Sequence, residues 1–398
     1  MTRRVGFFGL LGSGNIGNDG SFEAVLAHLR SGHDGVRVDA MCGGPEAVTA
    51  RYGVPAVAMH WYRGETTTAK GAAAIAAKAA GKIADAVRTF NWVREHDVVI
   101  VPGMGVLEAT LPLRPWGLPY SLLLLTASGR LTGTEIALVS VGADVVGRGP
   151  TRWLMTKAAK LAGYRSYRDE LSCESMVDMG VPADGDRVYP DLAFALPNPV
   201  TRARRGSVGL GVIAYRGGNA DRPYAEAIYR GYVTKLKRFV RGLLAEGRQV
   251  RLLTGDALDD EVVAELLADT GSPNLSAARV TSLPGLLREL ATVETVVASR
   301  YHNVLCALKL GKPTVSIGYA AKNDVLMADA GLAGLCQRIQ DLDLDRLTEQ
   351  FREAEKRSQE IATSLNEWNA AQRERIDDQF AALSALIGQS GRPKEAAR

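Results

Sequence analysis

The sequence has little of several features that mark whole classes of protein. Only four of its 398 residues are cysteine, and no two of them form a C-x-x-C pair. The five histidines do not cluster with the cysteines in the sequence. We therefore expect free thiols and neither a disulfide framework nor a metal site. The net charge of +4 is small for this length and the basic residues are scattered, which argues against a nucleic-acid partner. Apolar runs stay well below the length that spans a bilayer, so we expect no transmembrane segment and a cytoplasmic protein.

What the sequence does have is a repeated alternation of strand-like and helical stretches. Apolar runs at 97–101 and 136–141 are separated by helical patterns, and the alternation resumes from residue 208 with a helical stretch at 230–247. Strand–helix–strand repetition is typical of a parallel sheet with helices on both faces. We therefore predict an α/β protein with two doubly wound Rossmann-like domains facing a central cleft.

Composition along the chain suggests where the domains begin and end. We assign residues 1–195 to an N-terminal domain, the proline-rich and basic stretch 196–206 to a linker, and 207–340 to a C-terminal domain. Apolar residues at spacings of three, four, seven and eight predict an amphipathic helix or a broken helix pair over 341–390. Residues 391–398 are expected to be a tail.

A glycine-rich stretch near the start imitates a dinucleotide-binding fingerprint. Gly12-Ser13-Gly14-Asn15-Ile16-Gly17 is a formal G-x-G-x-x-G, and Asp39 follows 22 residues later. The first strand is expected to end near Phe8, however, and the helix to begin only at Phe22 with Ser21 as its cap. The intervening loop is too long for that fingerprint, so nicotinamide binding is disfavoured.

Two other roles for this glycine stretch stay open. The glycines can let two backbones pass closely, or the turn can cradle a ligand. Asn15 and Asp19 are the side chains in it with obvious chemistry.

A second constellation lies at residues 299–322. An apolar strand runs directly into Ser299-Arg300-Tyr301-His302, and a helix is expected to begin near Asn303. Arg300 and His302 would then lie at the carboxyl end of a strand and the amino end of a helix, where backbone N–H groups and the helix dipole favour anions. Lys322 follows the next strand at the same edge. Local capping and pairing is the alternative, but three cationic groups at one edge favour an anion site.

A third candidate is Arg168, in the stretch YRDELSCE. It follows a short strand and precedes a helix that Gly180 ends, which repeats the arrangement around Arg300 in the first domain. Asp169 is interpreted as the N-cap of that helix. One cation in each domain would suit a ligand with two anionic groups.

With these motifs in view, the chain resembles the polysaccharide pyruvyl transferase family from Val5 to about Leu332. The resemblance rests on the segments GLLGSGNIGNDGS, VIVPGMGVLE, VGADVVGRGP, YRDELSCE, VYPDLAF and, most specifically, ASRYHNVLCALKLGKPTVSIGYAAK. It implies a fold like that of two-domain GT-B glycosyltransferases, with the acceptor side in the N-terminal domain and the donor side in the C-terminal domain.

The resemblance also implies an activity. Phosphoenolpyruvate would donate its pyruvyl group as a ketal to hydroxyls of a sugar or glycan and release phosphate, without a further cofactor. The family's donor-binding residues carry over to Arg168, Arg300, Tyr301, His302 and Lys322. His302 would act as acid–base and Arg300 would offset charge on the departing phosphate. This interpretation depends on an electrostatic expectation: the Arg168 and Arg300 guanidinium groups, one from each domain, turn toward one donor pocket and are not paired with neighbouring acids. A lipid-linked acceptor would bring the protein to the inner face of the membrane.

The chain departs from the family's pattern where the acceptor is expected. The N-terminal turn reads Gly-Asn-Asp-Gly instead of Gly-Asp-Glu, and the triple-glycine segment appears as Pro-Gly-Met-Gly. We assign Asn15, Asp19 and Gly103 to acceptor binding. Two alternatives remain: a nucleotide-sugar glycosyltransferase of the same architecture, and a catalytically silent scaffold that keeps the fold.

Overall fold

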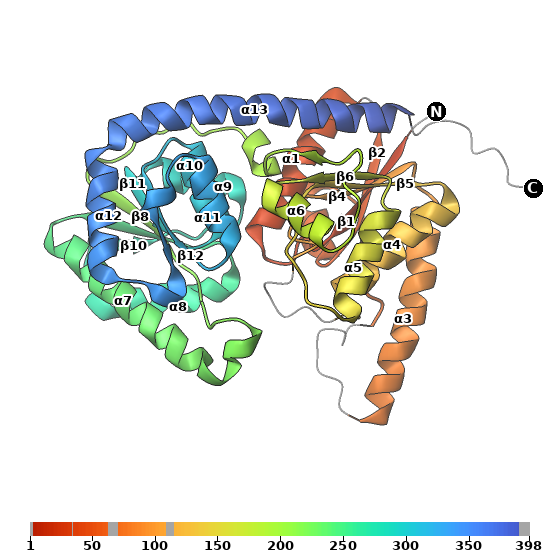
Figure 1. Cartoon of the computed structure of the whole chain (residues 1–398), viewed down its shortest axis with the longest axis horizontal. Coiled ribbons are helices and arrows are strands. Elements are labelled where there is room, and N and C mark those ends of the chain that lie inside the picture. Colours follow the sequence, from red (N-terminus) through yellow and green to blue (C-terminus); the bar gives the residue numbers. More distant parts are fainter. Residues whose placement is uncertain (1–2, 34, 63–70, 109–114, 390–398) are drawn as a thin grey trace, which may run out of the picture. The chain divides into compact units, whose positions relative to one another are not determined.

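The chain folds as two compact units. The computed structural model describes residues 3–33, 35–62, 71–108 and 115–389 (Figure 1). The first unit is built from the segments up to Ser13, from Ser21 to Leu192 and from Arg375 onward, and the second from Gly14–Gly20 and Ala193–Glu374. The tail expected at 391–398 lies outside the described residues.

The first unit is built on a parallel sheet. Within the described residues the sheet has seven strands in the order β3-β2-β1-β4-β5-β6-β7. The strands are β1 (Arg4–Gly9), β2 (Arg37–Cys42), β3 (Ala56–Ala58), β4 (Val98–Pro102), β5 (Glu135–Val141), β6 (Tyr164–Tyr167) and β7 (Arg187–Val188). The helices are α1 (Ile16–Gly32), α2 (Pro45–Tyr52), α3 (Ala72–Val93), α4 (Leu118–Thr132), α5 (Pro150–Leu161) and α6 (Glu170–Asp178). Helix α4 packs between α3 and α5, and β4 is buried along its whole length.

The second unit repeats this plan. Its described residues form a parallel sheet of six strands in the order β10-β9-β8-β11-β12-β13. The strands are β8 (Ser207–Gly211), β9 (Gln249–Leu253), β10 (Leu275–Ala277), β11 (Thr295–Ala298), β12 (Thr314–Gly318) and β13 (Cys336–Arg338). The helices are α7 (Ala225–Ala245), α8 (Asp260–Thr270), α9 (Leu283–Ala291), α10 (Tyr301–Lys309), α11 (Ala321–Asp329), α12 (Leu344–Lys356) and α13 (Ser358–Gln389), the last of which continues into the first unit.

The strand orders confirm the predicted pair of doubly wound, Rossmann-like sheets. In each sheet the order reverses beside the first strand, between β1 and β4 and between β8 and β11. In open parallel sheets, ligands bind outside the carboxyl ends of the strands at such a reversal. The segments that follow β1, β4, β8 and β11 therefore lie where a ligand is expected.

The start of α1 differs from the sequence prediction. We expected Ser21 to cap a helix at Phe22, but α1 begins at Ile16. The Asn15 Oδ1 accepts hydrogen bonds from the backbone N–H groups of Gly17 (3.0 Å) and Asn18 (3.3 Å), so Asn15 caps the helix. A strong cap outweighs the low helix propensity of the glycines that follow it.

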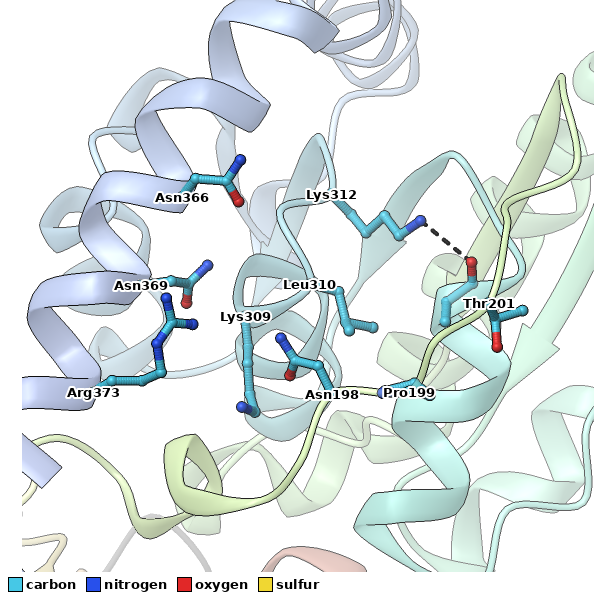
Figure 2. A pocket seen from close by; sticks show the side chains of 10 residues that line it. Asn198, Pro199, Thr201, Lys309, Leu310, Lys312, Asn366, Asn369 and Arg373 are labelled. Carbon is cyan, nitrogen blue, oxygen red and sulfur yellow. Dashed lines mark hydrogen bonds between the residues drawn. The ribbon is translucent and has the colours of Figure 1, made fainter. Parts of the chain in front are cut away.

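The C-terminal segment is a broken helix pair, one of the two forms predicted. Helix α12 ends at Lys356 and α13 begins at Ser358. Phe351 of α12 packs edge-on against Phe239 of α7, with ring centroids 5.7 Å apart. Asn369 of α13 donates a hydrogen bond to the Leu308 carbonyl at the end of α10 (3.0 Å) and is labelled in Figure 2.

Two expectations from composition can be compared with the structure. All four cysteines are free thiols, with Cys42 and Cys306 buried and Cys173 and Cys336 partly exposed. Among the described helices none combines the length and the apolar character that crossing a bilayer requires.

Candidate functional site

Arg300 lies at the turn between β11 and α10, in the N-cap position of the helix. Its guanidinium forms two hydrogen bonds with Asp259: Nε donates to Oδ2 at 2.9 Å and Nη2 to Oδ1 at 2.7 Å. Burial lowers the pKa of Arg300, but the hydrogen bonds and charge of Asp259 raise it overall. The expectation of an unpaired guanidinium was therefore wrong for Arg300.

Asp259 explains why this pair is rigid. It is fully buried, in the short 3-10 turn Ala257–Asp259, and it also accepts from the backbone N–H groups of Ala214 (3.0 Å) and Gly255 (3.3 Å). A buried carboxylate held by four donors fixes the plane of the guanidinium. Arginine has five N–H donors, of which Asp259 takes two, so donors remain for an anionic ligand.

His302 packs against the first turn of α1. A Cβ atom on Gly17 would lie 2.0 Å from the His302 Cε1, so only glycine admits the imidazole at this position. Gly20 likewise leaves room for Leu283, because a Cβ on Gly20 would lie 2.0 Å from the Leu283 Cδ1. The glycine-rich stretch thus serves close approach, one of the two roles left open. It also places Asn15 and Asp19 in the same compact unit as His302.

Lys322 joins this group from α11. Its Nζ lies 5.8 Å from the ring centroid of Tyr301 and 5.5 Å from that of Tyr319, within cation–π range of both. The rings of Tyr301 and His302 meet edge to face, with centroids 5.3 Å apart. The second unit therefore brings together four of the five predicted donor-binding residues.

Asn303 is a polar residue at this edge that sequence reasoning missed. It is fully buried, and neither its Oδ1 nor its Nδ2 has a hydrogen-bond partner among the described residues. A Cβ on Gly211, the last residue of β8, would lie 2.6 Å from its Nδ2. The Asn303 side chain thus packs against the end of β8, next to the point where the strand order reverses between β8 and β11. Its position directly after His302 was the available signal, but we interpreted it only as the start of a helix.

Arg168 lies in the first unit, immediately after β6. Its Nη2 forms an ion pair with Glu108, and its Nη1 lies 3.6 Å from the Asp191 Oδ2. Asp169 accepts from the Ser172 backbone N–H at 2.7 Å, which confirms its predicted role as the N-cap of α6. Arg168 is only 7% exposed, and Asp191 is buried beside it. For Arg168, too, the expectation of unpaired positive charge was wrong.

Glu108 is the second acid that the sequence did not single out. Two glycines make room for it: a Cβ on Gly105 would lie 2.5 Å from its carboxyl carbon, and one on Gly142 2.3 Å from its Oε1. Gly103, predicted for acceptor binding, has φ 56° and is followed by Met104 at φ 62°, which is unusual for a residue with a side chain. The Pro-Gly-Met-Gly turn after β4 thus shapes the backbone around a carboxylate.

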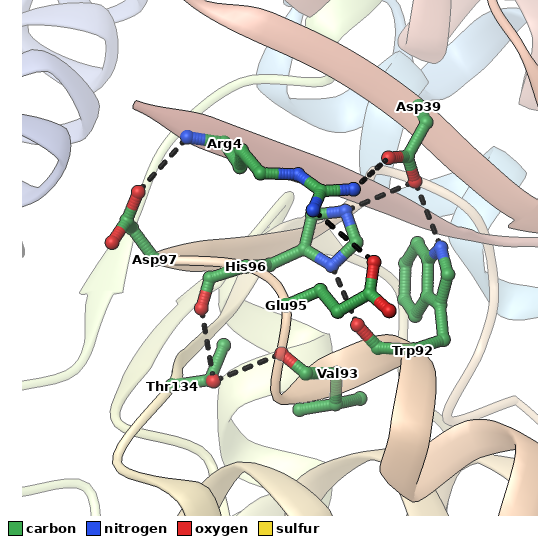
Figure 3. A network of polar contacts seen from close by, with 8 residues as sticks. All are labelled: Arg4, Asp39, Trp92, Val93, Glu95, His96, Asp97 and Thr134. Atoms are coloured by element: carbon green, nitrogen blue, oxygen red, sulfur yellow. Dashed lines mark hydrogen bonds and ion pairs between the residues drawn. The ribbon is translucent and has the colours of Figure 1, made fainter. Parts of the chain in front are cut away.

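Asp39, the acid of the formal dinucleotide fingerprint, forms hydrogen bonds and an ion pair with side chains of its own unit. Its Oδ1 accepts from the Trp92 indole N–H (2.8 Å) and lies 3.0 Å from the His96 Nε2, and its Oδ2 lies 3.4 Å from the Arg4 guanidinium (Figure 3). Burial acts to raise the pKa of Asp39, but these hydrogen bonds and charges lower it overall. The residue lies inside β2 and belongs to a structural network, which agrees with the rejection of a nicotinamide site.

Comparison with known families gives one match. A model of the family described as polysaccharide pyruvyl transferase matches residues 15–321, most of the chain. The matched range contains every predicted site residue except Lys322, which lies one position beyond its end. A search of the curated proteins found no match.

Comparison with solved structures shows the fold. The chain is similar to UDP-GlcNAc 2-epimerase from Neisseria meningitidis bound to UDP-GlcNAc, with a TM-score of 0.57, 9% identity, and 94% of this chain and 100% of that chain covered. It is also similar to a ugt transferase from Siraitia grosvenorii in complex with UDP, with a TM-score of 0.55, 11% identity, and 98% of this chain and 100% of that chain covered. A third similar structure is Acinetobacter baumannii MurG, with a TM-score of 0.53, 13% identity, and 97% of this chain and 99% of that chain covered. At these identities the likeness establishes a GT-B-like pair of Rossmann-like units and nothing about substrate.

Proposed function

The chain belongs to the polysaccharide pyruvyl transferase family, and from this premise we propose that it transfers the pyruvyl group of phosphoenolpyruvate to two hydroxyls of a sugar or glycan. The observation that carries the proposal is the group formed by Arg300, His302 and Lys322 at the carboxyl edge of the second sheet. Two cations and an imidazole lie there beside the N-terminus of α10, which favours a small, doubly charged anion.

Donor binding is assigned mainly to this second unit. The N–H groups of Arg300 that Asp259 does not use would hold the phosphate, and Lys322 and the backbone N–H groups of α10 would hold the carboxylate. Arg168 carries over from the family as a donor-binding residue. Its ion pair with Glu108 adds a second task, which is to hold that carboxylate in place.

The reaction needs one proton donated and two hydroxyl protons removed. The methylene carbon of phosphoenolpyruvate gains a proton, and an acceptor hydroxyl attacks the carbon that bears the phosphate and loses its own proton. A second hydroxyl then displaces phosphate from this carbon and closes the ketal, so that one donor and one diol give one ketal and inorganic phosphate. His302 is assigned the proton transfer at carbon.

Glu108 is assigned to the acceptor side. Its carboxylate is held by Arg168 and by a backbone in which Gly105 and Gly142 make room for it, and it follows β4 at the edge where ligands bind. A carboxylate so fixed can accept the proton of an attacking hydroxyl. Asn15 and Asp19 remain assigned to acceptor contacts.

Two experiments test the proposal. Phosphate release from phosphoenolpyruvate is measured against a panel of sugar and lipid-linked glycan acceptors, and the product mass is compared with that of a ketal. Thermal shift with phosphoenolpyruvate and with UDP separates the pyruvyl donor from a nucleotide donor, because only a ligand that binds the folded protein raises its melting temperature. Stabilisation by UDP alone would favour the glycosyltransferase alternative, and a protein that binds neither would be a scaffold.

A further inference from the structure

A polar pocket in the second unit lies apart from the site described above. It is a cavity of about 200 Å³ beside the end of α10, far larger than a single water needs. Figure 2 shows that its lining comes from the end of α10, from α13 and from the segment after Leu196, with Lys312 directed away from Arg373. The lining residues that carry the argument are Lys309, Lys312, Asn366, Asn369 and Arg373.

The pocket and the candidate active site lie at opposite ends of one helix. Helix α10 begins at Tyr301, at the carboxyl edge of the sheet, and ends at Lys309, just before β12 begins at Thr314. The pocket is therefore at the amino edge of the sheet. It shares no lining residue with the group around Arg300.

The lining is strongly positive. Lys309 is only 4% exposed and its Nζ donates to the Phe194 carbonyl at 3.0 Å, while the Lys312 Nζ donates to the Ala291 carbonyl at 3.3 Å. An ammonium has three N–H donors, so one carbonyl does not satisfy either lysine. Arg373 adds a third positive charge, and no carboxylate lies among the described lining residues. The negative end of the α10 dipole offsets only part of this charge.

Burial and the nearby Arg373 charge lower the pKa of Lys309 to about 8. Burial also lowers the pKa of Lys312, and the nearby Glu294 carboxylate partly opposes this shift. Collecting positive charge in a partly desolvated place is unfavourable unless an anion relieves it. The pocket therefore has the electrostatics of an anion site.

Asn369 adds an observation that does not depend on charge. It is 3% exposed, and its Nδ2 donates to the Leu308 carbonyl, which fixes the orientation of the amide. Its Oδ1 has no hydrogen-bond partner among the described residues. A buried acceptor of this kind calls for a donor. The dianion of a phosphate monoester and sulfate carry no donor, but a hydroxyl elsewhere on the same ligand supplies one.

We propose that this pocket binds a hydroxyl-bearing molecule with a phosphate or sulfate group, such as a sugar phosphate. Lys309 and Arg373 bind the oxyanion, and the Asn369 Oδ1 accepts a hydrogen bond from a hydroxyl. The site is a second ligand site, separate from catalysis.

Binding is measured on the full chain by calorimetry, without phosphoenolpyruvate or acceptor, at constant ionic strength. The probes are glucose 6-phosphate, sodium sulfate and glucose. Glucose 6-phosphate is expected to bind more tightly than sulfate, and glucose not to bind. Arg373→Gln is expected to weaken the binding of both anions at least about tenfold, since it removes one of the two charges that hold the oxyanion and its exposed position carries little fold stability. Arg238→Gln, on an exposed face of α7, is the matched control and should change nothing.

Sulfate also gives a pH test, because it stays a dianion between pH 6 and 9. Its affinity should fall as pH rises through about 8, where Lys309 loses its proton, and this dependence should disappear in Lys309→Met. No binding of either anion at about 10 mM would overturn the proposal, as would wild-type affinity in Arg373→Gln. An effect of Arg300→Lys equal to that of Arg373→Gln would place the anion at the active site instead. None of these readouts requires the transferase reaction.

Discussion

Arg300 and Asp259 form a bidentate ion pair, with N–O distances of 2.9 and 2.7 Å, at the edge of the second sheet where a donor is expected. The carboxylate is fully buried and the guanidinium side chain is 17% exposed. One side of the arginine is thus bound to the fold while the other remains available to a ligand. The pair couples the stability of this unit to the orientation of the Arg300 guanidinium, the group proposed to bind the donor.

Replacing Arg300 should cost stability as well as activity. Arg300→Met leaves the buried charge of Asp259 without its cationic partner, and we expect a loss of about 3 kcal/mol in the free energy of unfolding. The double variant Arg300→Met/Asp259→Asn should be less destabilised than the sum of the single variants by about 1 kcal/mol. Urea denaturation measures both. The exposed pair Arg216–Glu261 is the control, for which Arg216→Met should change stability by less than about 1 kcal/mol; strict additivity at Arg300 would contradict the coupling.

His302 and Arg300 should fail in different ways. His302→Ala removes the proposed acid–base and should lower kcat about 10²- to 10⁴-fold while phosphoenolpyruvate still raises the melting temperature. Arg300→Lys keeps a charge but loses the planar fork, so donor binding itself should be lost. Phosphate release and thermal shift distinguish these outcomes. Wild-type turnover in both variants would refute the assigned roles.

Gly17→Ala sets helix propensity against packing. Alanine within α1 should favour the helix by about 1 kcal/mol, but its Cβ would lie 2.0 Å from the His302 Cε1 and would displace the imidazole. We expect turnover to fall at least about tenfold. Gly242→Ala in α7 is the matched control, because its Cβ meets nothing within 4 Å, and it should keep full turnover. Equal activity in the two variants would mean that the position of His302 does not matter to the reaction.

Glu108→Gln tests the acceptor side. The amide keeps the shape of the side chain but cannot accept a proton, so kcat should fall about 10²-fold with little change in the KM for phosphoenolpyruvate. Asp169→Asn is the comparison, since Asp169 also approaches Arg168, at 3.7 Å, but serves as a helix cap. That variant should lose no more than about 1 kcal/mol of stability and retain turnover. A rise in KM alone for Glu108→Gln would assign Glu108 to donor binding.

The sequence predicted those parts of the site that a local pattern specifies. Arg300 and His302 were found because an apolar strand, a polar turn and a helix follow one another within a few residues. Asp259 and Glu108 were missed because they lie 41 and 60 residues from the arginines they pair with, and each resembles an ordinary surface acid in its own segment.

The start of α1 was missed for a related reason. The sequence shows Gly17 and Gly20 as residues that disfavour a helix, whereas their purpose is contact with His302 and Leu283, which are far away in the chain. The two doubly wound sheets and the positions of their central strands depend on short apolar runs, and these were predicted. Contacts between distant segments carry no local signal.

Asp39 should make the first unit sensitive to acid. Its folded-state pKa lies below the ordinary value of 3.8, so its stabilising contribution is complete above about pH 4 and is lost as pH falls through the folded-state pKa. Asp39→Asn should lose about 1 kcal/mol at pH 7 and show a shallower fall in stability between pH 5 and pH 2. Denaturation at a series of pH values measures this. Asp184→Asn, at an exposed position, should follow the wild-type curve; if Asp39→Asn did so too, the network around His96 and Trp92 would contribute nothing to acid stability.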